Sequence, residues 1–366
     1  MRIAFLSVFY PYRGGIAQFN AHLLEALGRD NEVRAFNFTR QYPDFLFPGK
    51  TQYVTPEDKA VPVESTRLLD SINPFTWGLT ARAILRWKPD LVVFSHWMSF
   101  FAPALGCVAA RLRRHGVKVV TVVHNAIPHE PKFFDKPLAR WFFKKSDRLI
   151  SMCDAVTADI RQLCPAATIV QRPHPVYDHF GTKQEKAAAQ AALGLTPGYR
   201  TLLFFGLIRD YKGLDLLIDA MRLLEPDYQL LIAGESYGSF DRYQARIDAS
   251  GCAGRIKVFN QYIADEDVPR LFSAADVCVL PYRSATQSGI TAIAQHFEVP
   301  LVATPVGGLA ESIERPGIGL MARDVSAEAL AEAIRAFYAA GPDHFIENIR
   351  QVKQTQTWPA FARTIL

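Results

Sequence analysis

Short, uninterrupted apolar runs alternate along this chain with segments whose apolar residues recur every three or four positions. Such runs are typical of strands buried on both faces, and the longer repeat is typical of helices packed on a sheet. The runs predict strands at 2–8, 32–38, 91–95, 117–123, 167–171, 201–205, 229–233, 256–259, 277–280 and 301–304. The repeats predict helices at about 16–27, 154–163, 214–221, 290–297 and 327–340. This alternation predicts an α/β fold with parallel, doubly wound sheets.

The length of the chain, 366 residues, suits two such domains better than one compact core. A proline-containing polar stretch followed by an alanine-rich segment is typical of a domain junction and places the boundary near 176–181. We therefore expect a first domain over 1–178 and a second over 179–350. Residues 39–74 carry several prolines and no clear repeat, which predicts a long irregular loop.

The composition describes an ordinary globular protein, with 49% hydrophobic and 21% charged residues. The five cysteines are scattered without C-x-x-C spacing, so neither a disulfide framework nor a zinc site is predicted, and a cytoplasmic location fits. No signal peptide or bilayer-spanning segment is expected. The net charge of +5 is too small to indicate a nucleic-acid partner.

The strongest candidate for chemistry is the stretch 202–221, LLFFGLIRDYKGLDLLIDAM. A buried strand ends at Gly206, and a helix follows a loop that carries Arg209 and Lys212. A strand-to-helix turn presents backbone N–H groups and a helix dipole to an anion, and two cations beside it would suit a diphosphate. The alternative is that both are solvated loop charges.

Other candidates also follow predicted strands, where parallel sheets bind ligands. His124 follows the strand 117–123, and His96 and His129 are candidates of lower rank. A glycine pair precedes the first helix without matching G-x-G-x-x-G, so a nicotinamide site is poorly supported. Small polar residues before the helix 290–297 form another possible anion-binding site, at the start of that helix. The candidate donor-binding residues are Gly14, Gly15, Gly206, Glu235, Thr286, Gln287, Ser288 and Gly289.

Two further patterns have structural as well as functional interpretations. Asp265 and Asp267 form D-x-D, but they precede a helical repeat and are interpreted as cap and first-turn acids, so no metal is proposed. The segment 136–148 mixes aromatic and basic residues, as interfacial membrane helices do. A core-packed helix with a solvated basic face is the alternative.

The motif G-x-x-R-x-Y-K-G-x-D-x-L-[LI]-x-A after an apolar strand resembles the family 4 (group 1) glycosyltransferases. The resemblance implies the GT-B fold, in which two Rossmann-like domains face each other across a cleft and a last helix, here 351–366, crosses back to the first domain. It also implies that Arg209 and Lys212 hold the donor diphosphate, although the family's Arg usually follows the glycine directly, where this chain has Leu207. His124 in V-x-H-N would contact the donor sugar and the reacting centre, and Gly14–Gly15 would lie near the acceptor.

The chain departs from the family at the two glutamates that normally contact the sugar and the ribose. Those positions fall near Ala285 and Ile293, within a variant spelling S-A-T-Q-S-G. Gly307, Gly308 and Glu311 do match the family's G-G-x-x-E.

The resemblance implies transfer of a sugar from a nucleotide-diphosphate-sugar donor to an acceptor hydroxyl, with retention of configuration and no cofactor or metal. The acceptor would be a carbohydrate or a lipid-linked molecule of polysaccharide or glycolipid assembly, with possible peripheral contact at the inner face of the membrane. Two alternatives stay open. One is a sugar-nucleotide epimerase of the same fold, and the other is an inactive nucleotide-sugar-binding protein, suggested by the absent glutamates.

Overall fold

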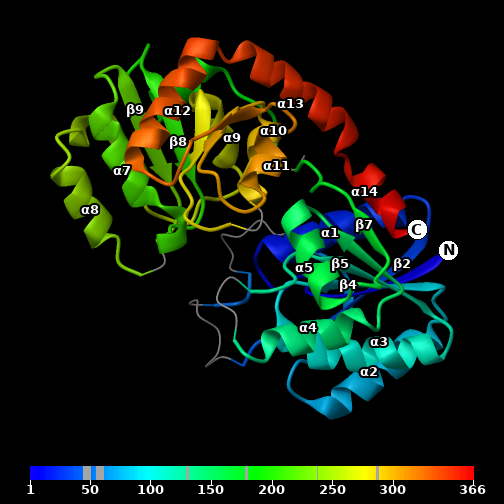
Figure 1. Cartoon of the computed structure of the whole chain (residues 1–366). Helices are drawn as coiled ribbons and strands as arrows, with labels where there is room; N and C mark the ends of the chain where they lie inside the picture. The colour runs from blue at the N-terminus through cyan, green and yellow to red at the C-terminus, as the bar shows by residue number, and fades with distance from the viewer. Residues whose placement is uncertain (44–50, 55–61, 129–131, 178–179, 237, 286–287) are drawn as a thin grey trace. The chain divides into compact units, whose positions relative to one another are not determined.

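The computed structural model describes residues 1–43, 51–54, 62–128, 132–177, 180–236, 238–285 and 288–366. The chain forms two compact units, each with its own parallel sheet and hydrophobic core (Figure 1). Unit 1 comprises Met1–His174 together with Thr357–Leu366, and unit 2 comprises Pro175–Gln356. No helix among the described residues combines the length and apolar character that crossing a bilayer requires.

Unit 1 contains a seven-stranded parallel sheet in the order β3-β2-β1-β4-β5-β6-β7. Its strands are β1 Arg2–Leu6, β2 Glu32–Arg40, β3 Ser65–Asp70, β4 Leu91–His96, β5 Lys118–Val123, β6 Arg148–Ser151 and β7 Ile169–Gln171. Its helices are α1 Gly15–Gly28, α2 Pro74–Arg86, the 3₁₀ turn η2 Ser99–Phe101, α3 Ala102–Arg114, α4 Asp135–Phe143, α5 Asp154–Leu163 and α14 Trp358–Ile365. Every residue of β4 is buried, as expected of a central strand covered on both faces.

Unit 2 contains a six-stranded parallel sheet in the order β10-β9-β8-β11-β12-β13. Its strands are β8 Arg200–Phe205, β9 Tyr228–Ala233, β10 Ile256–Phe259, β11 Val277–Leu280, β12 Leu301–Ala303 and β13 Gly319–Met321. The helical elements around it are α6 Lys186–Ala192, η3 Asp210–Lys212, α7 Leu214–Leu223, α8 Asp241–Asp248, η4 Ala253–Arg255, α9 Val268–Ala274, α10 Gly289–His296, α11 Leu309–Ile313, α12 Ala327–Ala340 and α13 Asp343–Thr355.

The strand order reverses at β1 and β4 in unit 1 and at β8 and β11 in unit 2. In open parallel sheets, ligands bind outside the carboxyl ends of the strands at such a reversal. We therefore expect a ligand-binding site at the loops that follow these four strands. These loops carry the glycine pair, the Gly206–Lys212 segment and the residues that lead into α10, and His96 is the last residue of β4.

Two expectations from the sequence are wrong in detail, and one helix was missed. The segment 39–74 is not irregular throughout, because β2 continues to Arg40 and β3 spans Ser65–Asp70. The helix α2, which follows directly, had not been predicted. The stretch 136–148 is not one helix, since α4 ends at Phe143 and Arg148 begins β6.

Candidate functional site

The ends of three separate elements meet at Gly206, directly after β8. A Cβ atom on Gly206 would lie 3.1 Å from Nζ of Lys212 and 3.1 Å from Cδ1 of Ile290. Gly206 has φ +100°, so a side chain here would be strained as well as crowded. The turn η3 and the first turn of α10 therefore both approach the carboxyl end of β8, although α10 begins far along the sequence.

The ammonium group of Lys212 is buried beside this point. The residue is 8% exposed, and its Nζ lies 5.5 Å from the centroid of the Tyr282 ring. Burial is the main cause that lowers the pKa of Lys212 from 10.5 to about 8; Cys278 opposes this shift and the nearby charge of Arg209 adds to it. No ion pair within the described part of the chain involves Lys212. A buried cation without a protein anion is costly, which favours an anionic ligand at this place.

The backbone fixes the position of Lys212 tightly. Lys212 N–H donates to the carbonyl oxygen of Arg209 at 3.0 Å, and Gly213 N–H donates to that of Asp210 at 3.1 Å. Gly213 has φ +64°, and a Cβ there would lie 1.9 Å from the carbonyl oxygen of Pro281, just after β11. The turn after β8 is thus packed directly on the chain that leaves β11, with no room for a side chain between them.

The structure brings three more predicted residues to this edge of the sheet. The N–H of Ile208 donates to the carbonyl oxygen of Glu235 at 2.8 Å, so the segment after β9 lies alongside the segment after β8. Ser288 occupies the N-cap position of α10 without a side-chain cap bond, and its Oγ lies 3.3 Å from the hydroxyl of Tyr282. Gly289 is the exposed first residue of that helix. Thr286 and Gln287 lie outside the described residues.

In unit 1, His124 lies directly after β5 and is largely buried. Its ring makes an edge-to-face contact with Phe19 of α1, at 4.7 Å between centroids. Burial, with smaller contributions from His174 and His96, lowers the pKa of His124 to about 3. The imidazole is therefore neutral at physiological pH, able to share hydrogen bonds with hydroxyl groups but not to act as a cation.

The neighbouring strand end carries His96, which sequence reasoning ranked lower. His96 is 1% exposed, its carbonyl oxygen accepts a hydrogen bond from His124 N–H at 2.8 Å, and its ring packs on Phe142 and Phe143. Among the described residues, neither ring nitrogen has a hydrogen-bond partner. Burial lowers the pKa of His96 to about 3. In the sequence, only its position at a strand end marked His96 as a candidate. That its ring nitrogens lack hydrogen-bond partners among the described residues is seen only in the structure.

Gly14 and Gly15 are exposed at the start of α1, and a Cβ on either would meet nothing within 4 Å. The loop before them is held by two buried asparagines. Asn20 donates to the Ser7 hydroxyl at 2.8 Å and to the carbonyl oxygen of Val8 at 2.9 Å. Asn37 accepts from the N–H of Phe9 at 3.2 Å and donates to that residue's carbonyl oxygen at 3.1 Å. The glycine pair is thus an open, well-anchored backbone surface.

The predicted capping role of Asp267 needs a correction. Asp267 stands at the N-cap position of α9, but its side chain makes no cap hydrogen bond and instead forms an ion pair with Arg270 at 2.6 Å. Among the residues that the structure describes, no group of three or more His, Cys, Asp or Glu side chains is placed to hold a metal ion. Tyr282, whose ring lies beside the Lys212 ammonium, was missed because a tyrosine after an apolar strand carries no distinctive sequence signal.

Comparison with known proteins assigns both halves of the chain to related families. The family model described as "Glycosyltransferase Family 4" matches residues 13–177, and the one described as "Glycosyl transferases group 1" matches residues 199–340. The GDP-mannose:glycolipid 4-beta-D-mannosyltransferase of Xanthomonas campestris pv. campestris is 30% identical over 252 residues, covering 64% of this chain and 66% of that protein. The D-inositol 3-phosphate glycosyltransferase of Mycolicibacterium gilvum (strain PYR-GCK) is 32% identical over 168 residues, covering 45% and 38%.

This chain therefore spans less than two thirds of the length of either relative. The fold, by contrast, is shared along its whole length with a solved structure. The sucrose-phosphate synthase of Thermosynechococcus elongatus superposes with a TM-score of 0.76 at 20% identity, over 100% of this chain and 97% of that one. Family matches to both halves and this common two-sheet architecture show that the chain belongs to the group 1, family 4 glycosyltransferases with the GT-B fold.

Proposed function

We propose that this chain transfers a sugar from a nucleoside-diphosphate sugar to a hydroxyl group of an acceptor. The observation that carries the proposal is the buried ammonium of Lys212, which has no ion pair among the described residues. When the bond between the sugar and the diphosphate breaks, negative charge develops on the leaving phosphate. A preorganised cation in a site of low dielectric stabilises that charge more than water would.

Most of the predicted residues take a role in this proposal. Lys212 and Arg209 neutralise the diphosphate, with the glycine at 206 keeping the backbone beside it free of a side chain. The first turn of α10, which includes Ser288 and Gly289, offers N–H groups and its dipole to the donor, together with Thr286 and Gln287. Glu235 lies on the segment after β9 that borders the same strand ends. His124 contributes a neutral imidazole to the sugar and the reacting centre.

The acceptor that we propose is a saccharide, either free or linked to a lipid. The names of the two relatives give this range, since one acts on a glycolipid and the other is a D-inositol 3-phosphate glycosyltransferase. We further propose that the reaction retains anomeric configuration and needs no divalent cation, because the protein's own cations neutralise the leaving group. The anomeric coupling constants of donor and product, compared by NMR, test the stereochemical part.

A donor panel tests the function directly. The purified chain is incubated with UDP-, GDP- and ADP-sugars, with and without simple glycosides and a total lipid extract, and nucleotide release and product mass are measured. We expect acceptor-dependent release of nucleotide. Conversion of the donor to another sugar nucleotide without release would instead identify an epimerase, and tight donor binding without turnover would identify a binding protein.

The matched variants are Lys212→Ala and Arg222→Ala, because Arg222 is an exposed cation on α7 in the same unit. We expect Lys212→Ala to weaken nucleotide binding and to lower turnover by about two orders of magnitude, and Arg222→Ala to leave both unchanged. Arg209→Ala should also weaken nucleotide binding and lower turnover, although this residue is shifted from the family position. Wild-type turnover by a folded Lys212→Ala protein would refute the assignment.

A further inference from the structure

The helix α2 exposes large apolar side chains on its outer face. Phe75 is 86% exposed and Leu79 is 56% exposed, whereas Ala81 and Ile84 on the opposite face are fully buried. The outward positions Phe75, Leu79, Arg82 and Arg86 follow one another at helical spacing, so they form one stripe that is apolar at its start and basic at its end. A phenylalanine so fully exposed calls for a partner surface.

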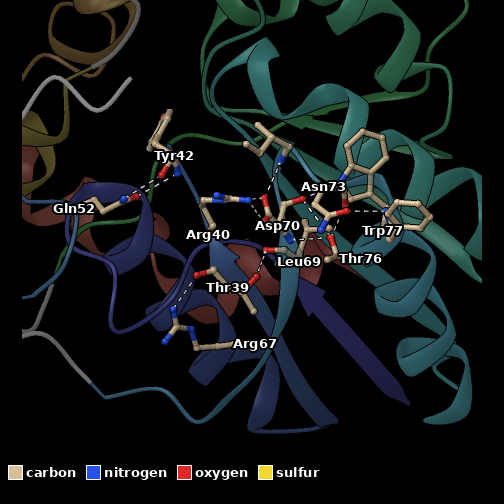
Figure 2. A network of polar contacts seen from close by, with 12 residues as sticks. Thr39, Arg40, Tyr42, Gln52, Arg67, Leu69, Asp70, Asn73, Thr76 and Trp77 are labelled. Atoms are coloured by element: carbon tan, nitrogen blue, oxygen red, sulfur yellow. Dashed lines mark hydrogen bonds and ion pairs between the residues drawn. The ribbon is translucent and has the colours of Figure 1, made fainter. Parts of the chain in front are cut away.

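A polar network holds the start of α2 in place, as Figure 2 shows. The Asp70 carboxylate accepts hydrogen bonds from Arg40 Nε at 3.1 Å and from Ile72 N–H at 3.1 Å. The Asp70 carbonyl oxygen accepts from the indole N–H of Trp77 at 2.8 Å, and Asn73 caps the helix by accepting from Phe75 N–H at 3.2 Å. Because the residues on both sides of Phe75 are bonded inward, its outward direction is fixed by the fold.

The exposed face continues across two further helices of unit 1, α3, which packs on α2, and α4, which packs on α3 (Figure 1). Arg111 of α3 crosses α2 at Gly78, where a Cβ would lie 2.8 Å from its Nη1. Trp141 of α4 crosses α3 at Gly106, where a Cβ would lie 2.1 Å from the indole. These two glycines let long side chains bridge adjacent helices, and the outer face of α2, α3 and α4 is therefore one continuous surface.

This surface is strongly basic. Residues 74–145 contain twelve Lys and Arg against three Asp and Glu, a formal charge of +9, whereas the whole chain carries +5. Neither α2 nor α3 contains a carboxylate, and the one in α4, Asp135, is buried against Ser99. Within the described residues, Arg82, Arg86, Arg111, Arg114 and Arg140 form no ion pair. A hollow of about 710 Å³ between α4 and α5 is lined by Lys136, Arg140, Trp141 and Lys144 among others.

We propose that the outer face of α2, α3 and α4 docks on the surface of an anionic lipid bilayer. Phe75 and Leu79 would enter the boundary between headgroups and acyl chains, and the unpaired arginines would contact lipid phosphates. The sequence left two interpretations of 136–148 open, an interfacial membrane helix and a core-packed helix with a solvated basic face. The structure buries Phe142 and Phe143 there and exposes Phe75 and Leu79 instead.

The direction in which α2 runs places the apolar end of its stripe toward the candidate site of unit 1. In a strand-to-helix unit of a parallel sheet, the helix starts at the carboxyl edge of the strands, and this is the edge at which His96 and His124 lie. The apolar end of the stripe is therefore the end nearer those histidines. The bilayer contact stands independently of the proposed sugar transfer, which its own donor panel tests.

Vesicle sedimentation tests the proposal. The purified chain is mixed with vesicles of phosphatidylcholine alone or with equal phosphatidylglycerol, at low and high salt. We expect binding to the anionic vesicles that weakens with salt, and little binding to the neutral ones. Phe75→Ser with Leu79→Ser, and separately Arg82→Glu with Arg86→Glu, should each lower the partition coefficient at least tenfold. Leu223→Ser with Arg222→Glu, an exposed pair on α7 of unit 2, should not change it.

Thermal unfolding and nucleotide binding, measured on the same variants, separate loss of docking from loss of structure. No binding of the wild-type chain to anionic vesicles at low salt would overturn the proposal, as would equal losses in the α2 and α7 variants. A concentration-dependent dimer abolished by the Phe75→Ser, Leu79→Ser variant would also overturn it, by making the face a contact between copies of the chain.

Discussion

At the scale of single residues, the charge of Lys212 should govern how ligand binding responds to pH. Burial lowers its pKa to about 8, and an anion bound beside it would stabilise the ammonium and raise the pKa again. Above pH 8, binding must therefore take up a proton. We expect the affinity for a nucleoside diphosphate to fall by up to tenfold per pH unit above about 8.

Calorimetric titration between pH 7 and 9.5 checks this dependence, and Lys212→Met should abolish it. The stability of the protein without ligand should change with pH in the opposite direction to the affinity. Between about 8 and 10.5 the unfolded chain binds more protons than the folded one, so the free energy of unfolding should rise with pH there. An unchanged slope in the Lys212→Met variant would show that another group is responsible.

His124 should affect sugar transfer without affecting nucleotide affinity. Its neutral imidazole lies in unit 1, whereas the candidate phosphate-binding groups lie in unit 2. We expect His124→Ala to bind nucleoside diphosphates as the wild type does, while its turnover falls by about two orders of magnitude. Isothermal titration measures the nucleotide affinity of each protein, and an assay of the same preparation measures its turnover. Equal loss of both properties would indicate a folding defect instead.

His96 offers a prediction about stability. Its two ring nitrogens are buried and have no partner among the described residues, which costs about 1–3 kcal/mol. His96→Leu should therefore raise the free energy of unfolding by about 1 kcal/mol. Ser95→Ala is the control, because it removes a real hydrogen bond to Asn20 of 2.6 Å and should lower stability. Denaturant unfolding of both variants measures these changes in the free energy of unfolding. A destabilised His96→Leu protein would contradict the prediction.

At the scale of elements, the turn between β8 and α7 depends on close backbone packing. Gly213 combines φ +64° with the carbonyl oxygen of Pro281, which would lie only 1.9 Å from a Cβ. We expect Gly213→Ala to lower the free energy of unfolding by more than about 2 kcal/mol, from strain and displacement together. Gly254→Ala in η4 is the control, because a Cβ there meets nothing within 4 Å. Equal stability of the two variants by denaturant unfolding would contradict this.

At the scale of the whole molecule, the two units are joined where their connecting segments meet. The N–H of Val176 donates to the carbonyl oxygen of Gln356 at 2.8 Å, so the chain enters and leaves unit 2 at one place. The last helix, α14, belongs to unit 1, where Trp358 and Phe361 pack on Phe19, the residue that also contacts His124. The helix α14 thus supports the environment of His124, a candidate catalytic residue.

If the proposed site is right, the intact protein should work without a divalent cation, because Lys212, Arg209 and the start of α10 would neutralise the leaving diphosphate. Turnover should survive exhaustive treatment with EDTA and dialysis against metal-free buffer. Loss of turnover on chelation, restored by magnesium or manganese, would show that a metal takes part. The Lys212→Ala variant, tested with added magnesium, is the control for a cation that merely replaces the lost charge.

The sequence by itself determined the alternation of strands and helices and the strand ends that carry the candidate site. Continuous apolar runs predicted β8 to β12 closely, since strands buried on both faces need apolar residues at every position. Family resemblance and strand-end position together singled out Lys212 and His124. The same reasoning missed α2, and the physical reason is its outer stripe. Exposed Phe75 and Leu79 add apolar residues to the solvent face and so hide the helical repeat.

Only the tertiary structure decided which of these residues come together and how deeply they are buried. Lys212 and Ile290 both approach Gly206, although Ile290 is distant in sequence. Gly213 likewise packs directly on Pro281. The lowered pKa of Lys212 follows from burial, and so does the lack of hydrogen-bond partners, among the described residues, for the ring nitrogens of His96; burial depends on every neighbouring element at once. Local patterns record the periodicity of one element. Burial and charge pairing are properties of the packed molecule, so they could not be predicted from any single stretch.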